Sequence, residues 1–279
     1  MRLRCLFPLV PILATAFLPA GDARADDPEA DRGHLTVDPV ADGAVIATGA
    51  GFSTLLGLVI STGEIQPLKA GLESALLGID RIAVTQKIDP NAGLYSDIGL
   101  YGAVGFAALD SLSSGLQHRW NATLVDAVMY SESLSLALAF DDIVKIAVRR
   151  PRPIDYAPEN ASNTTNTDLA LSFFSGHAAV VAAMSATATY LAFVHSPRSP
   201  RPWITLAAGT LLTAFVGYER IRAGEHFPTD IIMGALGGAA TGVLVPHMHR
   251  TKSASAPVWI DLAPASRGTG ASLGVHGLF

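Results

Sequence analysis

The stretch ERIRAGEHFPTD, residues 219–230, gathers charged side chains directly before a long apolar run. Arg220, His226 and Asp230 follow the spacing R-x5-H-x3-D, and Pro228 suits the first turn of a helix. A carboxylate close to one imidazole nitrogen fixes the tautomer and leaves the other nitrogen free to act as a nucleophile. The simpler interpretation is a His–Asp pair that caps a helix.

A second polar stretch, KIAVRRPRP at residues 145–153, holds two candidate anion-binding cations. Lys145 falls at the end of a predicted helix, and Arg152 follows it, directly before a proline. Cations are favoured at helix C-termini, and Asp141 can pair with Lys145 one turn away. Taken alone, this stretch indicates only the end of a helix.

The third feature is Ser175-Gly176-His177, which lies where an apolar helix is predicted to begin, within residues 172–186. Serine is a good helix cap, and glycine lets the backbone come close to a ligand. The free N–H groups of a first helical turn can hold an anion. An ordinary capped helix with a surface histidine explains the same pattern.

Together, the three features indicate a phosphate site. A helical bundle can bring these helix ends to one face, where three cations, two imidazoles and free amides would meet. Such groups bind a dianionic phosphate and stabilise its trigonal-bipyramidal transition state.

The order K-x6-R-P, S-G-H and R-x5-H-x3-D over residues 145–230 resembles the type 2 phosphatidic acid phosphatase superfamily. That group includes lipid phosphate phosphatases, bacterial non-specific acid phosphatases and vanadium haloperoxidases. The resemblance implies that His226 attacks phosphorus to form a phosphohistidine, that Asp230 orients His226, and that His177 protonates the leaving oxygen. It implies no metal and no cofactor, with the phosphate held by Lys145, Arg152, Ser175, Gly176 and Arg220.

The resemblance therefore predicts a hydrolase of phosphate monoesters or diphosphates, with lipid or polyprenyl phosphates favoured. The alternatives are a vanadate-dependent haloperoxidase and a catalytically decayed envelope protein. Two positions depart from the family pattern: Phe174 replaces the usual proline, and Glu219 replaces the usual serine. Glu219 puts a negative charge beside the anion site unless it points away or pairs with Arg150 or Arg222.

Long uncharged runs without strand-like alternation predict an all-α, membrane-associated bundle of about six core helices. Glycines at 234, 238 and 242 form a stripe suited to close helix packing. The helical phosphatase domain is expected at 43–249, after a flexible lead-in at 26–42. The tail, 250–279, is irregular or forms a short hairpin, and His247 and His249 before it are expected on a plain surface. The runs lie at 43–63, 98–112, 121–148, 178–194, 202–218 and 231–246.

The composition limits the partners. The chain is 49% hydrophobic, only 15% charged and has a net charge of −5, with no basic block. A nucleic-acid partner is therefore excluded, and the expected partners are a membrane and a phosphorylated lipid or small molecule.

Residues 1–25 have the pattern of a secretory signal, with basic residues first, an apolar run at 5–20 and Ala23-Arg24-Ala25 as a cleavage site. An uncleaved anchor helix is the alternative. The single cysteine, Cys5, lies inside this segment, so an exported chain would have no thiol and no disulfide, zinc–thiolate site or cysteine catalysis.

The expected location is the inner membrane with a periplasm-facing site, or the periplasm in soluble form. If the four later runs all cross a membrane, the three polar features share one side. The tail sequence HMHRTK then lies on the other side, as the positive-inside rule expects for an outward-facing site. A cleaved signal reverses that orientation if both 43–63 and 98–112 cross. We therefore expect 98–112, which is short and contains Asp110, not to cross.

Overall fold

The structure, a computed structural model, describes residues 35–117, 120–156, 171–250, 259–264 and 271–276. Six long helices form a bundle in this part of the chain, which confirms the predicted all-α class. A short helix, α2 (Arg81–Thr85), and two 3-10 helices, η1 (Glu73–Ala75) and η2 (Pro153–Tyr156), lie in the connections. The long helices are α1 (Pro39–Ser61), α3 (Ala92–Gln117), α4 (Trp120–Val148), α5 (Gly176–His195), α6 (Arg201–Arg222) and α7 (Pro228–Met248).

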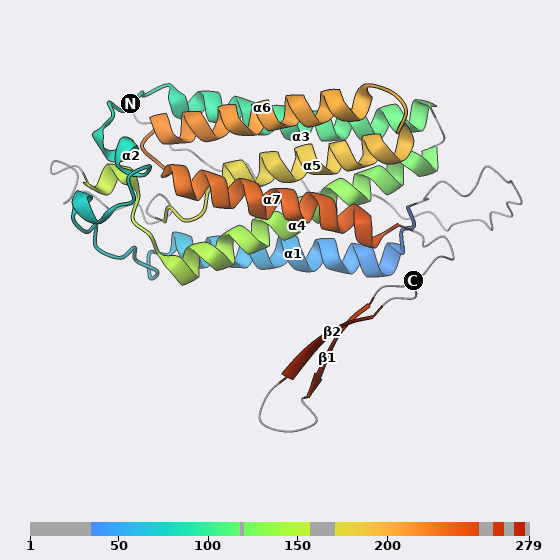
Figure 1. The fold of residues 1–279 in the computed structure, drawn as a ribbon, viewed down its shortest axis with the longest axis horizontal. Helices are drawn as coiled ribbons and strands as arrows, with labels where there is room; N and C mark the ends of the chain where they lie inside the picture. The colour runs from blue at the N-terminus through green and yellow to red at the C-terminus, as the bar shows by residue number, and fades with distance from the viewer. Residues whose placement is uncertain (1–34, 118–119, 157–170, 251–258, 265–270, 277–279) are drawn as a thin grey trace, which may run out of the picture.

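The long helices lie side by side along one axis, and successive helices alternate in direction (Figure 1). The N-termini of α3, α5 and α7 therefore lie at the same end of the bundle as the C-termini of α1, α4 and α6. We call this the polar end. Residues 39 and 248, the first residue of α1 and the last of α7, both lie at the opposite end.

Helix α5 occupies the centre of the bundle and packs against α3, α4, α6 and α7. It is rich in alanine, and most of its length is buried. Small side chains on every face allow several helices to approach one central helix closely. This central position fixes His177, in the first turn of α5, between the ends of the surrounding helices.

The predicted glycine stripe lies between α7 and α5. A Cβ on Gly234 would lie 2.5 Å from the backbone oxygen of Ser175. A Cβ on Gly238 or Gly242 would overlap the carbonyl of Ala179 or Ala183. The stripe therefore sets the separation of the two helices whose N-termini carry the candidate histidines.

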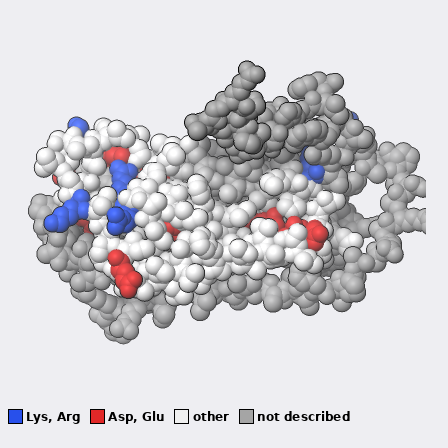
Figure 2. Space-filling view, turned by 90° about the horizontal axis from the view of Figure 1, so that it is seen from below, with Lys and Arg blue, Asp and Glu red and all other residues white. Residues whose placement is uncertain are grey.

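The exterior of the bundle is apolar, as expected of a membrane protein. Five helices, α1, α3, α4, α5 and α7, are long and apolar enough to cross a membrane. On the face that Figure 2 shows, most of the Lys and Arg side chains gather at one end and a row of acidic side chains lies toward the other, with uncharged surface between them. Large apolar side chains face outward from several helices, including Leu58, Phe106, Leu109, Leu211 and Leu236.

Length and composition do not support the expectation that 98–112 stays out of the membrane. These residues belong to α3, which is 26 residues long and is one of the five candidate spans. Asp110 is accommodated because its carboxylate accepts hydrogen bonds from Arg201, at 2.7 Å, and from the Tyr130 hydroxyl, at 2.8 Å. By contrast, the run 202–218 lies in α6, which is not one of the five helices that are long and apolar enough to cross a membrane.

The boundaries differ from prediction at the start of the domain. Helix α1 begins at Pro39, inside the segment expected to be a flexible lead-in. Asp38 caps this helix by accepting from the amides of Val40 and Ala41, and Pro39 takes the first position.

In the tail, β1 (Trp259–Pro264) and β2 (Ala271–His276) form an antiparallel hairpin, the more ordered of the two expected forms. The predicted signal at 1–25 lies outside the described residues.

Candidate active site

All three polar features predicted from the sequence meet at the polar end. The end of α4 carries Lys145, the start of α5 carries His177, and the end of α6 carries Arg220. His226 lies in the short connection to α7. The backbone amide of Ser175 donates to the carbonyl of Asp230 at 3.1 Å, which joins the N-termini of α5 and α7 directly.

His226 is almost fully buried, and its ring is held on one side only. Nδ1 lies 2.7 Å from the backbone oxygen of Ser172, so Nδ1 carries the proton and donates it to this carbonyl. Nε2 is then the nitrogen with the free lone pair. Burial lowers the pKa of His226 well below its usual 6.5, and Arg220, Arg152 and Lys145 act in the same direction. The ring is therefore neutral and nucleophilic at neutral pH.

Asp230 does not hydrogen-bond His226 directly, because its nearer oxygen lies 3.9 Å from Nδ1. The carboxylate instead accepts from the hydroxyl of Ser172 and, at 2.8 Å, from the amide of Phe227. Ser172 thus connects the two residues: its hydroxyl bonds Asp230 and its carbonyl holds the His226 ring. Asp230 acts on the histidine through this intermediate.

Arg150 also binds Asp230 and joins it to a second carboxylate, that of Asp80. Its guanidinium lies 2.5 Å from Asp230 and 2.8 Å from the buried Asp80, and it stacks 3.8 Å above the ring of Phe227. Asp80 also accepts from the amide and hydroxyl of Thr229 in the first turn of α7. These contacts fix the start of α7 and, with it, the position of His226.

His177 is held by a carboxylate that the sequence did not point to. Its Nε2 lies 2.9 Å from Oδ1 of Asp97, which belongs to the second turn of α3. Nδ1 is then the nitrogen available to a substrate. The side chain of Asp97 is about half exposed to solvent, at the polar end of the bundle.

Lys145 reaches the start of α5 because Gly176 has no side chain. Lys145 pairs with Asp141 at 2.6 Å, as predicted from their spacing. A Cβ on Gly176 would lie 2.5 Å from the Asp141 carboxylate and 3.5 Å from Nζ of Lys145. The hydroxyl of Ser175 caps α5 by accepting from the amide of Ala178 at 3.4 Å. The close approach places the lysine charge beside the first amides of the helix.

The two arginines of the predicted phosphate site share one carboxylate. Glu225 accepts from Arg152 at 2.8 Å, and it also contacts Arg220. The Nε of Arg220 is buried and has no hydrogen-bond partner within the described residues. A guanidinium with a spare buried donor is suited to an anion. Glu225 therefore engages the cations that the resemblance assigns to phosphate.

The two departures from the family pattern leave the site intact. Glu219 is buried and pairs with Arg222 at 3.2 Å, one of the two partners considered from the sequence. Phe174 is also buried and packs against the ring of Phe140, with centroids 5.6 Å apart. Neither side chain makes a contact with His177 or His226 that the structure describes.

Several contacts at the site were not foreseen: Asp97 on His177, Ser172 on His226, Glu225 on the two arginines, and Arg150 on Asp80 and Asp230. Ser172 and Glu225 lie within the stretches singled out from the sequence, so proximity in the chain was a usable signal. Asp97 is separated from His177 by 80 positions, and no local pattern marks it.

Comparisons with known proteins agree with the predicted resemblance. Residues 126–254, which contain every predicted site residue, match the family model of the PAP2 superfamily, and this match confirms the resemblance. Among solved structures, the chain is similar to the crystal structure of the first transmembrane PAP2 type phosphatidylglycerolphosphate phosphatase from Bacillus subtilis. That similarity has 20% sequence identity and a TM-score of 0.45, over 72% of this chain and 94% of that chain. No curated protein matches the chain.

Proposed function

We propose that this chain, whose residues 126–254 match the PAP2 superfamily, is a metal-independent phosphatase that works through a phosphohistidine. The observation that carries the proposal is the arrangement at the polar end. One buried, neutral imidazole presents a free Nε2 there, beside a second imidazole and three cationic side chains.

In the first step, Nε2 of His226 attacks phosphorus, the N–P bond forms, and the bond from phosphorus to the leaving oxygen breaks. His177 starts this step protonated on both ring nitrogens, with Nε2–H donating to Asp97; it gives its Nδ1 proton to the leaving oxygen and is left neutral. In the second step, water attacks phosphorus and returns a proton to His177, and the N–P bond breaks. Cationic side chains neutralise the phosphoryl oxygens in both steps.

The favoured substrates are lipid or polyprenyl phosphates. The candidate spans and the outward-facing apolar side chains support a membrane location, and the polar end lies at one limit of the uncharged surface in Figure 2. A phosphate carried on a membrane lipid reaches such a site from the interface, with its tail still in the bilayer.

In this proposal the site faces the periplasm. The tail HMHRTK follows α7 at the opposite end, and the positive-inside rule favours placing that end in the cytoplasm. Residue 39 lies at the same end as residue 248, so both are in the cytoplasm if α6, which runs alongside the five candidate spans, crosses with them. Cleavage after Ala25 would place residue 39 outside. We therefore propose that residues 1–25 stay attached and do not cross the membrane, because an anchor helix with its basic N-terminus inside would also place residue 39 outside. A green fluorescent protein fused to the C-terminus should fluoresce in the cytoplasm, and lack of fluorescence from a stable fusion would contradict this orientation.

The function is tested by phosphate release from lipid, polyprenyl and soluble phosphates, using the purified chain with and without detergent. The proposal expects metal-independent release that vanadate inhibits, with the highest kcat/KM on a lipid substrate in detergent micelles. Peroxide-dependent bromination after vanadate loading, without phosphate release, would instead identify a haloperoxidase. A folded protein inert in both assays would indicate a decayed site.

A further inference from the structure

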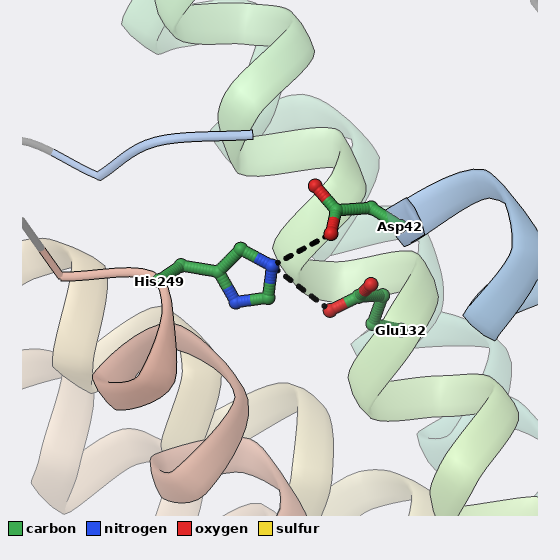
Figure 3. Close-up of side chains that lie close together, drawn as sticks. All are labelled: Asp42, Glu132 and His249. Atoms are coloured by element: carbon green, nitrogen blue, oxygen red, sulfur yellow. Dashed lines mark hydrogen bonds and ion pairs between the residues drawn. The ribbon is translucent and has the colours of Figure 1, made fainter. Parts of the chain in front are cut away.

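A second cluster of ionisable side chains lies at the end of the bundle away from the active site. It joins Asp42 in the first turn of α1, Glu132 in α4 and His249 directly after α7. Figure 3 shows the ring of His249 facing both carboxylates. Its Nε2 lies 3.2 Å from Asp42 and 3.4 Å from Glu132. One potential ligand atom of each residue lies within 4.8 Å of the others.

The tautomer of His249 makes this arrangement unfavourable without a further proton or a cation. Nδ1 lies 2.8 Å from the backbone oxygen of Val245, an acceptor only, so Nδ1 carries a proton. The neutral ring therefore points the lone pair of Nε2 at two carboxylates. Electron-rich atoms at these distances need a proton or a cation among them, which is a second proton on the ring, a proton on one carboxylate, or a metal ion.

Glu132 supplies an independent observation. Its side chain is only 2% exposed, and Oε1 is buried with no hydrogen-bond partner in the described part of the chain. A buried carboxylate oxygen without a partner is costly. The other oxygen of this carboxylate is the one that faces His249. A metal ion at the cluster would offset the charge of this buried carboxylate, which His249 reaches through one oxygen only.

We propose that Asp42, Glu132 and His249 bind a divalent transition-metal ion, with zinc as the best fit. An imidazole nitrogen and carboxylate oxygens are ordinary zinc ligands, and no thiolate is required. With Zn–N and Zn–O bonds of about 2.0–2.2 Å at a tetrahedral angle, the N and O atoms lie roughly 3.3–3.5 Å apart. The observed separations of 3.2 and 3.4 Å agree with that value.

The backbone around the cluster is already fixed. The amide of Thr36 donates to the carbonyl of His249 at 2.9 Å, and the amide of Asp38 donates to the second oxygen of Asp42 at 2.7 Å. Two ligands come from α1 and α4, and the third follows α7 directly, so they are far apart in the sequence. Bound zinc would join α1, α4 and α7 at this end and stabilise the bundle, and it would act independently of the phosphatase site.

The test is zinc binding to the full chain, purified in detergent without a histidine tag and stripped with a chelator. Wild type should bind about one zinc per chain by elemental analysis. With zinc about a hundredfold above Kd, Tm should rise by roughly 5–10 °C.

Glu132→Gln keeps the side-chain shape but weakens a ligand, and it should lower zinc affinity at least tenfold. The matched control is His247→Gln, which changes an exposed histidine that pairs with Tyr190 instead, and it should bind zinc as wild type does.

A second readout keeps the test valid if Glu132→Gln fails to fold. Cobalt(II) bound to wild type should show visible absorption typical of a tetrahedral site, and Asp42→Asn should reduce this absorption. The proposal is overturned if wild type binds no more zinc than Glu132→Gln and Asp42→Asn. It is also overturned if His247→Gln alone abolishes binding. Either result would mean that a proton, and not a metal ion, holds the three side chains together.

Discussion

The backbone oxygen of Ser172 lies 2.7 Å from Nδ1 of His226, so a carbonyl and not a carboxylate fixes the tautomer of the candidate nucleophile. The hydroxyl of the same serine bonds Asp230, which lies too far from the ring for a direct hydrogen bond. A carbonyl cannot take up a proton, so this arrangement leaves Nε2 as the one reactive nitrogen.

His177 should matter most when the leaving group is poor. His177→Ala should lower kcat by about 10²–10⁴-fold for an alkyl phosphate, because the alkoxide leaves only when protonated. The loss should be much smaller for an activated aryl phosphate. Asp97→Asn should show the same leaving-group dependence more weakly, since Asp97 acts by orienting His177. Equal losses on both substrates would contradict a role in proton transfer.

Glu225 should compete with phosphate for the two arginines. Glu225→Gln removes a negative charge that contacts both Arg152 and Arg220. Inorganic phosphate should then inhibit more strongly, with Ki lowered about fivefold for roughly 1 kcal/mol of relieved competition. The matched control is Asp89→Asn, which removes a carboxylate from Arg222, outside the predicted phosphate site. Its Ki should be unchanged. A higher Ki in Glu225→Gln would mean that the carboxylate positions the arginines instead.

The pH dependence should reflect the lowered pKa of His226. The neutral ring is the nucleophile and the protonated ring is inactive, so a lowered pKa extends activity toward acid. The acid limb of kcat/KM should therefore lie well below pH 6.5. An activated aryl phosphate that is fully ionised over this range is the suitable substrate. A half-maximal rate on the acid side at pH 6.5 or above would contradict the neutral, buried nucleophile.

The glycine stripe offers a stability test with a close control. Gly238→Ala would force a Cβ into the carbonyl of Ala179, and overpacking of this kind costs about 1–3 kcal/mol or more. Gly237→Ala, one position earlier in α7, would meet the rings of Phe140, at 3.4 Å, and Phe174, at 3.7 Å, and no backbone atom among its nearest neighbours. Thermal unfolding in detergent should show a lowered Tm for Gly238→Ala alone. Equal Tm values for the two variants would mean that α5 and α7 are not closely packed.

The sequence was informative about the candidate active site because charged residues beside apolar helices cost free energy unless something pairs with them. That argument singled out Arg220 and His226, and the combination of the three polar features added Lys145 and His177; the structure brings all four to one end of the bundle. The sequence also predicted the six long helices, since uncharged runs without alternation favour helices.

What the sequence could not supply are partners from distant helices. Asp97 and His177 are 80 positions apart, and Asp42 and His249 are 207 apart, so no local spacing links them. The same limit misled the interpretation of α3. Asp110 was taken as a sign that this segment stays out of the membrane, but Arg201 and Tyr130 satisfy its charge from neighbouring helices. His249 was expected on a plain surface for the same reason.

The central claim is that His226 becomes covalently phosphorylated, and trapping the intermediate tests it most directly. Wild type mixed with a ³²P-labelled substrate and quenched in alkaline detergent, where an N-phosphoimidazole survives, should carry label on His226 by peptide mapping. His226→Ala should carry none, and its turnover should fall at least about 10³-fold while its Tm stays near that of wild type. Label on another residue, or a His226→Ala variant that turns over at the wild-type rate, would contradict the account.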